Sequence, residues 1–299
     1  METVLEVKGL IKYYGSLKAV NNLSFSVKKG SVFGFLGPNG SGKSTTLGVI
    51  TKVTNPTAGF FSWFGEPACN AHLKRLGTLL ERPNFYGYMD AVDNLKIVAE
   101  IRGKSADGIS DILRVVKLYD RRKSRFKSYS FGMQQRLAIA SAMLGDPEVL
   151  ILDEPTNGLD PEGIAEIRQM ITTIAGAGKT IILASHLLDE VQKVCNDVII
   201  LQNGSKIYEG AISGISPEKM IIELKAPDMI SLKEVVVTHP RVVQIEMYGD
   251  MILAQLDSAV EPAEINSYMH KYGVSLSHLA VQHANLETQF LELLKTHQP

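Results

Sequence analysis

The sequence lacks the features that mark secreted or membrane-spanning proteins. Its 299 residues contain two cysteines, Cys69 and Cys195, which lie far apart and outside any CxxC spacing. A disulfide framework or a zinc site is therefore not expected, and a reducing compartment is the natural environment. The N-terminal METVLEVKGL has no basic stretch followed by an apolar core, so no signal peptide is predicted. No apolar run approaches the roughly 20 residues of a membrane span, so any membrane role would require a partner.

The sequence also lacks an excess of either charge sign. Lys and Arg total 31 and Asp and Glu total 32, which gives a net charge of −1. Without a basic excess, nucleic acid is not expected as the main partner. The hydrophobic content of 45% is ordinary for a globular protein, and the length allows one large or two modest domains.

What the chain does contain is a series of strand and helix patterns up to about residue 210. The apolar runs at 31–36, 149–152 and 181–185 are typical of buried parallel strands. Helical spacing occurs within 91–120, where Ile109, Ile112, Leu113 and Val116 recur at i, i+3, i+4 and i+7, and again at 133–144. Asn203-Gly204 between two strand-like runs predicts a β-hairpin.

The pattern changes after about residue 211. Residues 242–256 alternate around a Tyr-Gly-Asp turn, and 260–271 and 285–296 show helix-like patterns, the second with Asn285 as its candidate cap. The sequence therefore predicts a first domain of residues 1–210 and a small α+β domain of residues 211–299, which carries no chemical motif.

A phosphate-binding loop follows the run at 31–36 and precedes a helical stretch. The segment GPNGSGKS fits GxxxxGK[ST], in which glycines turn backbone N–H groups toward a polyphosphate and the helix N-terminus adds positive charge. Lys43 can reach the β and γ phosphates, and the Ser44 hydroxyl can bind Mg²⁺. The alternative is a Gly-rich turn without a functional role. The candidate nucleotide-binding residues here are Gly37, Pro38, Asn39, Gly40, Ser41, Gly42, Lys43, Ser44 and Thr45.

Three further side chains fall at the ends of predicted strands. Asp153 and Glu154 leave the run at 149–152, so Asp153 can hold Mg²⁺ through water while Glu154 polarises the attacking water. The alternative is a solvated strand end. His186 follows the run at 181–185, where the nucleotide edge is expected, although a lone histidine is more often structural. Tyr14 can stack on an adenine ring, or simply pack.

Together these motifs resemble the ABC-type ATPases, in the family's order, over roughly residues 3–210. GPNGSGKST is similar to the Walker A loop, VLILDE to Walker B, PTNGLD ending at Asp160 to the D-loop, and ASH to the switch histidine. Ser130-Phe-Gly-Met-Gln134 stands where the family's signature LSGGQ belongs. Phe131 and Met133 depart from the pattern, while Ser130 and Gly132 are retained.

The resemblance implies an α/β fold: a P-loop ABC-type nucleotide-binding domain with a helical subdomain at about 85–145, followed by the small α+β domain. It also implies ATP and Mg²⁺ as cofactors and catalytic roles for Glu154 and His186. A homodimer or pseudo-dimer would sandwich two ATP molecules head to tail. The nucleotide would then contact the signature and D-loop residues of the opposite subunit, namely Ser130, Gly132, Gln134 and Asp160.

By resemblance, the chain is the ATPase subunit of a membrane transporter. The short stretch between Lys43 and Ser130 leaves no room for the long coiled coils of chromosome-maintenance relatives, and a single phosphate loop disfavours tandem translation-factor relatives. The helical subdomain would dock on separate permease subunits at the inner face of the cell membrane, in the cytoplasm. The alternatives are a soluble ABC ATPase in repair or assembly, and a nucleotide-binding regulator without turnover.

The stretch LLERPNFY places Glu81 where most of the family carries the glutamine of the Q-loop. This sequence stretch and the FGM of the signature are similar to those of the subgroup that exports antimicrobial peptides such as bacitracin and lantibiotics. Glu81 is therefore predicted to face Mg²⁺, which prefers oxygen ligands. The alternative is a surface ion pair with Arg82 or Arg75.

The basic run at 121–129 permits a nucleic-acid or lipid patch. A solvated helix end, stabilised by its cations, is the favoured interpretation.

Overall fold

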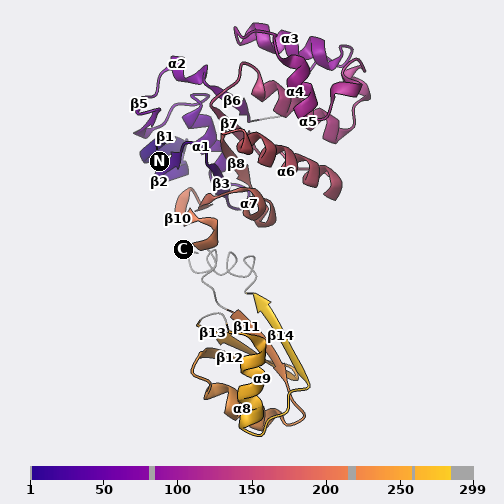
Figure 1. Cartoon of the computed structure of the whole chain (residues 1–299). Coiled ribbons are helices and arrows are strands. Elements are labelled where there is room, and N and C mark those ends of the chain that lie inside the picture. The colour runs from indigo at the N-terminus through magenta and orange to yellow at the C-terminus, as the bar shows by residue number, and fades with distance from the viewer. Residues whose placement is uncertain (1, 81–84, 215–219, 258–259, 284–299) are drawn as a thin grey trace. The chain divides into compact units, whose positions relative to one another are not determined.

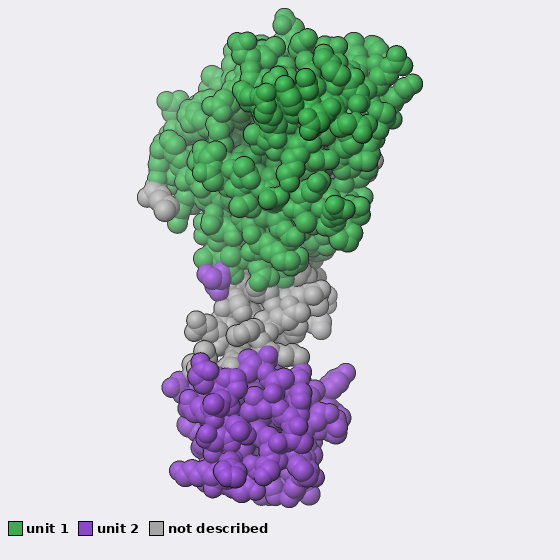
Figure 2. All heavy atoms as spheres, turned by 45° about the vertical axis from the view of Figure 1, so that its right-hand side comes forward, with its two compact units in different colours: residues 1–212 green, residues 213–299 purple. Residues whose placement is uncertain are grey.

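The computed structural model describes residues 2–80, 85–214, 220–257 and 260–283. The chain divides into two compact units, Met1–Ile212 and Ser213–Pro299 (Figure 2). None of the helices in the described ranges is long and apolar enough to cross a membrane.

A six-stranded sheet in the first unit places the carboxyl ends of its parallel strands along one edge. Its order is β10-β9-β3-β8-β7-β6, with every neighbouring pair parallel except β10 and β9 (Figure 1). The predictions of buried parallel strands at 149–152 and 181–185 are confirmed. The strands are β3 (Val32–Leu36), β6 (Leu76–Leu79), β7 (Val149–Asp153), β8 (Thr180–Ser185), β9 (Asp197–Gln202) and β10 (Ser205–Ala211).

The register of this sheet positions three loops beside one another. Leu36 of β3 pairs with Ser185 of β8, and Asp153 of β7 pairs with Ala184. The residues that follow these strands therefore emerge at the same edge, with His186 directly after β8, the central strand of the three. The predicted hairpin at Asn203-Gly204 is also confirmed, since both residues have positive φ and join antiparallel β9 and β10.

A second sheet of the first unit is antiparallel and has the order β2-β1-β4-β5. Trp63 of this sheet is fully buried and donates its indole N–H to the carbonyl of Ile50 at 2.9 Å, which attaches the sheet to helix α1. The elements are β1 (Thr3–Tyr14), β2 (Leu17–Lys28), β4 (Ala58–Trp63), β5 (Glu66–Pro67), α1 (Lys43–Ile50) and α2 (Asn70–Leu73).

Among the described residues between β6 and β7 the regular elements are helices, and Figure 1 shows α3, α4 and α5 grouped together. Residues 91–120 form two helices rather than a continuous one, because Gly103 and Gly108 adopt positive φ between them. Two more helices, α6 and α7, follow β7 and β8. The helices are α3 (Ala91–Ile101), α4 (Ile109–Val115), α5 (Phe131–Met143), α6 (Pro161–Gly176) and α7 (Leu188–Val194).

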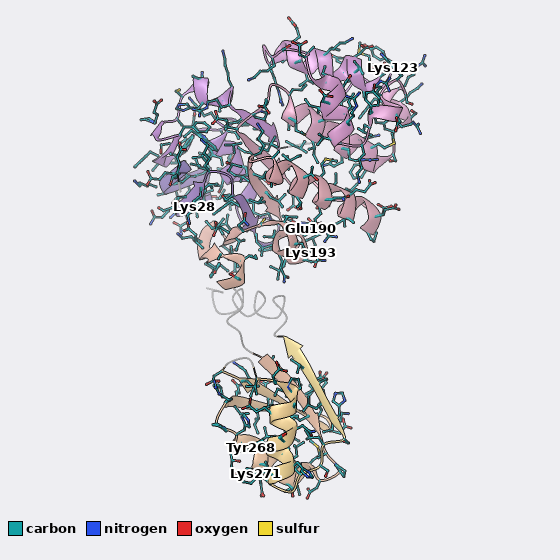
Figure 3. The ribbon with its side chains drawn as sticks, in the orientation of Figure 1. Lys28, Lys123, Glu190, Lys193, Tyr268 and Lys271 are labelled. Atoms are coloured by element: carbon teal, nitrogen blue, oxygen red, sulfur yellow. The ribbon has the colours of Figure 1, made fainter. Side chains whose placement is uncertain are left out.

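The basic run at 121–129 does not form an α-helix end. It contains the last residue of one short 3-10 turn, η1 (Tyr119–Arg121), and all of a second, η2 (Phe126–Ser128). Lys123 is exposed (Figure 3) and pairs with Asp90 at 3.3 Å, and the guanidinium of Arg122 stacks on the Tyr119 ring. Lys123 and Arg122 are thus engaged in local contacts, in agreement with a solvated segment.

The second unit is a small α+β fold, as predicted. A four-stranded antiparallel sheet of order β12-β13-β11-β14 packs its apolar residues against two helices, in the βαββαβ arrangement of ferredoxin-like folds. The hairpin at 242–256 and the helix within 260–271 are confirmed, whereas 285–296 lies outside the described residues. The elements are β11 (Met220–Lys225), α8 (Met229–Val237), β12 (Val242–Tyr248), β13 (Met251–Leu256), α9 (Pro262–Lys271) and β14 (His278–His283), preceded by η3 (Ile212–Gly214).

Candidate nucleotide site

The loop between β3 and α1 has a backbone path that only glycine permits at two positions. A Cβ atom on Gly37 would lie 2.3 Å from the carbonyl oxygen of Leu201. Gly42 has φ +101°, and a Cβ there would lie 2.6 Å from the carbonyl oxygen of Ala19. Contacts this short cannot be accommodated, because the opposing atoms belong to the backbone. The glycines of the motif therefore fix the shape of the loop against β9 and β2.

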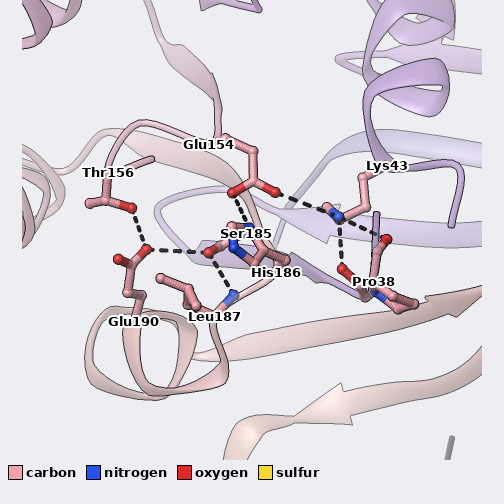
Figure 4. A network of polar contacts seen from close by, with 9 residues as sticks. Pro38, Lys43, Glu154, Thr156, Ser185, His186, Leu187 and Glu190 are labelled. Carbon is pink, nitrogen blue, oxygen red and sulfur yellow. Dashed lines mark hydrogen bonds and ion pairs between the residues drawn. The ribbon is translucent and has the colours of Figure 1, made fainter. Parts of the chain in front are cut away.

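Lys43 is buried at the start of α1 and directs its ammonium group toward oxygen atoms. It donates hydrogen bonds to the carbonyls of Gly37 at 2.7 Å and Pro38 at 3.2 Å, and lies 3.5 Å from Oε1 of Glu154 (Figure 4). Because these three partners are acceptors, the ammonium group is held inside the loop where a polyphosphate would add further oxygens.

A pocket of about 400 Å³ opens over this loop. Tyr14 forms part of its wall, is 49% exposed, and has the Lys12 ammonium 4.9 Å from its ring centroid. An exposed ring at the mouth of a polar pocket is available for stacking by a flat ligand. The full lining comprises Tyr14, Leu17, Lys18, Ala19, Asn39, Gly40, Ser41, Gly42, Lys43, Ser44, Thr45, Glu154 and Asn203.

The Asp153 carboxylate has one oxygen that the described protein groups leave without a hydrogen bond and that a cation could bind. Its side chain accepts a hydrogen bond from Ser44, while its Oδ1 is buried with no hydrogen-bond partner in the described ranges. Burial raises the pKa of Asp153 and the charge of Glu154 raises it further, although Ser44 and Lys43 act in the opposite direction. A buried carboxylate oxygen beside a hydroxyl is the kind of hard donor set that Mg²⁺ binds.

Glu154 connects two elements of the site. Its Oε2 lies 2.8 Å from Nδ1 of His186, on the side opposite its contact with Lys43 (Figure 4). Glu154 has φ +47°, which is unusual for a side chain with a Cβ, and its N–H donates to the carbonyl of Ala184 at 2.9 Å. The start of α1 and the ends of β7 and β8 thus bring Lys43, Glu154 and His186 into one row.

The predicted signature and D-loop residues do not line this pocket. Ser130 caps α5 by accepting from the Met133 N–H at 3.3 Å, and Asp160 caps α6 by accepting from Gly163 at 2.9 Å. Gln134 donates its side-chain amide to the carbonyl of Tyr129 at 3.1 Å. Gly132 lies in the first turn of α5. These local contacts account for the residue types, and any role toward a nucleotide would require a second subunit.

Glu81 lies outside the described residues, so its predicted contact with Mg²⁺ stays a prediction. The residues just before it, Leu79 and Leu80, line a second pocket of about 200 Å³ together with Asp153 and Glu154. One alternative partner, Arg75, forms a two-pronged ion pair with Glu148 at 2.6 and 2.9 Å.

Sequence reasoning missed a buried polar cluster behind Glu154 and His186. Glu190 of α7 accepts hydrogen bonds from Thr156 and Ser185. No motif marks these residues. The one available signal is an acidic residue four positions after His186, on a helix that follows a buried strand.

The fold and this site define a P-loop ATPase. The sequence pattern described as "ABC transporter" matches residues 20–157. The bacitracin transport ATP-binding protein BcrA of Bacillus licheniformis is 33% identical over 98% of both chains. The lantibiotic transport ATP-binding protein SrtF of Streptococcus pyogenes is 37% identical over 71% of this chain and 92% of its own. A solved ATP-binding cassette of an ABC transporter in its ADP conformation is 26% identical with a TM-score of 0.63, covering 71% of this chain and 92% of that one.

This chain belongs to the ABC transporter family of ATP-binding proteins, and it is an ATPase of that family. The resemblance to the antimicrobial-peptide subgroup is confirmed, since two of these relatives are named for bacitracin and lantibiotic transport. Both names describe transport rather than repair or assembly, so the transporter interpretation is favoured over the soluble alternative.

Proposed function

We propose that this chain hydrolyses ATP to energise an exporter of antimicrobial peptides whose membrane-spanning subunits are separate chains. The observation that carries the proposal is the row of Lys43, Glu154 and His186 beneath a pocket built on the phosphate loop. The similarity to the BcrA and SrtF proteins supports the choice of substrate class. The chain would act in the cytoplasm, at the inner face of the cell membrane.

Each side chain of the site has a role in this proposal. Lys43 neutralises the β and γ phosphates, and Glu154 accepts a proton from the attacking water. His186 holds the carboxylate of Glu154 in place through its bond to Oε2. Ser44 and Asp153 would hold Mg²⁺, with Glu81 as a further proposed ligand, and the ion would supply charge neutralisation at the phosphate oxygens.

The proposal includes assembly in two directions. A second ATPase subunit, identical or related, would present Ser130, Gly132, Gln134 and Asp160 to the nucleotide of this chain. The helical region at about 85–145 would contact the membrane subunits, and residues 211–299 would form an accessory domain. The position of Ser130 and Asp160 outside the pocket of their own chain is what supports a contribution in trans.

The test is a complementation assay in a peptide-sensitive host. The chain is expressed with its membrane subunits, as wild type or as Glu154→Gln, and survival is measured against bacitracin and a lantibiotic. We expect the wild type alone to raise the tolerated concentration. Equal survival with the variant and the wild type would contradict ATP-driven export, and activity that depends instead on DNA or ribosomes would support the soluble alternative.

A further inference from the structure

Glu190 is a buried carboxylate that the roles above do not use. It lies on α7 (Figure 3). The residue is 5% exposed, and its Oε1 is buried without a hydrogen-bond partner in the described part of the chain. The nearby cations Lys193 and Arg168 pair instead with the exposed Asp189. Burying a carboxylate costs free energy unless hydrogen bonds replace those it made to water. The hydrogen bonds of Glu190 therefore indicate its role.

The other oxygen of Glu190 accepts two hydroxyl groups from different loops. The Thr156 hydroxyl donates to Oε2 at 2.5 Å, and the Ser185 hydroxyl donates to the same atom at 3.2 Å. The Ser185 oxygen in turn accepts from the backbone N–H of Leu187 at 3.0 Å (Figure 4). Thr156 and Ser185 are themselves buried, so few other partners are available to these hydroxyls.

These contacts enclose the two residues assigned to the chemistry. Thr156 comes two positions after Glu154, while Ser185 and Leu187 flank His186. Glu154 is in a left-handed conformation that persists only where surrounding contacts hold it. One carboxylate therefore links the turn after β7 to the turn after β8, at the point where Glu154 and His186 meet at 2.8 Å.

We propose that Glu190 is a positioning residue for ATP hydrolysis. It fixes the separation of the two turns and thereby keeps the Glu154 carboxylate aligned between Lys43 and His186. This inference rests on the roles proposed for Glu154 and His186. It predicts that loss of Glu190 lowers the turnover rate while ATP binding, which depends on the phosphate loop, is retained.

The experiment measures phosphate release by the purified full-length chain for a matched set of variants. Glu190→Ala removes the acceptor of both hydroxyls, and a displacement of about 1 Å in a catalytic group can reduce the rate about 100-fold. We expect kcat to fall by about 10- to 100-fold with the KM for ATP within about twofold of wild type. Glu190→Gln keeps an oxygen that can accept both hydroxyls, so it should retain about a third of kcat or more.

Asp189→Asn is the control, because it changes the neighbouring carboxylate on α7, which is exposed and makes no contact with Thr156 or Ser185. We expect its kcat to equal that of wild type. Thr156→Val should lower kcat, and adding it to Glu190→Ala should cause little further loss, since both changes break the same contact. Losses that multiply, or a KM that rises as kcat falls, would overturn the positioning role.

Circular dichroism melts separate misplacement from unfolding. If Glu190→Ala does not fold, Thr156→Val and Ser185→Ala decide, and normal kcat in both would overturn the inference. Glu154→Gln is measured beside them. Its inactivity combined with normal kcat in a folded Glu190→Ala would overturn the positioning role alone. Full activity of Glu154→Gln would overturn the proposed roles and the inference with them.

Discussion

Replacing Glu154 with glutamine should change ATP binding and ATP hydrolysis in opposite directions. The carboxylate lies between two partners, with Oε1 3.5 Å from Nζ of Lys43 and Oε2 2.8 Å from Nδ1 of His186. Glutamine has nearly the same shape, so it removes the charge without emptying the space. Two functions of the carboxylate are then lost together: its basicity toward water, and its hold on Lys43.

The distance sets the size of the second effect. Opposite unit charges 3.5 Å apart attract by about 5 kcal/mol at an effective dielectric constant of about 20. The cost of desolvating both groups offsets much of this attraction. If about 1.4 kcal/mol of the interaction free energy remains, its loss would change the ATP dissociation constant about tenfold. The same carboxylate would repel the phosphates that Lys43 binds. We therefore expect ATP to bind about tenfold more tightly to Glu154→Gln, while loss of the base slows hydrolysis by about 100-fold or more.

The assay combines equilibrium binding of a fluorescent ATP analogue with phosphate release at saturating Mg²⁺-ATP. Glu234→Gln, an exposed charge-matched change in the second unit, serves as the control and should leave both values unaltered. Sizing chromatography with ATP should show the variant accumulating as a dimer. Weaker ATP binding together with unaltered turnover would refute the reasoning, because both the base and its electrostatic coupling to Lys43 would then be absent.

Three other changes test separate parts of the site. Lys43→Ala should abolish measurable ATP binding, since it removes the buried ammonium group of the loop; calorimetry with ATP checks this. Ser130→Arg should block the ATP-dependent dimer in sizing chromatography while the monomer's ATP affinity changes little; a strong loss of monomer binding would argue for a different geometry. Asp153→Asn should abolish Mg²⁺-dependent turnover yet stabilise the nucleotide-free chain. Because the pKa of Asp153 is raised on folding, stability falls as pH rises through that pKa, so the gain in melting temperature should be larger at pH 7 than near pH 4.

The phosphate loop, the buried strands and the strand-end residues were predictable because each depends on neighbours in sequence. The loop motif, the apolar runs, Glu154 and His186 all fall within short segments whose geometry follows from local chemistry. The break between α3 and α4 was not predictable, because glycine also occurs within helices. Only the structure shows that Gly103 and Gly108 have positive φ and interrupt the helix. The cluster around Glu190 was not predictable, because Thr156 and Glu190 are brought together only by the order of β8 and β7.

The arrangement of the site also bears on how two subunits could pair. Within one chain, the phosphate loop and Glu154 line the pocket, whereas the capped starts of α5 and α6, at Ser130 and Asp160, do not. If these helix starts complete the nucleotide site of a partner in a dimer, the partner completes the first site with the same surfaces, because a closed assembly of two like subunits has a two-fold axis. Two ATP molecules would then be needed to fill one interface. The proposed dimer would accordingly close cooperatively with ATP, and hydrolysis at either Glu154 would remove part of what holds both subunits together.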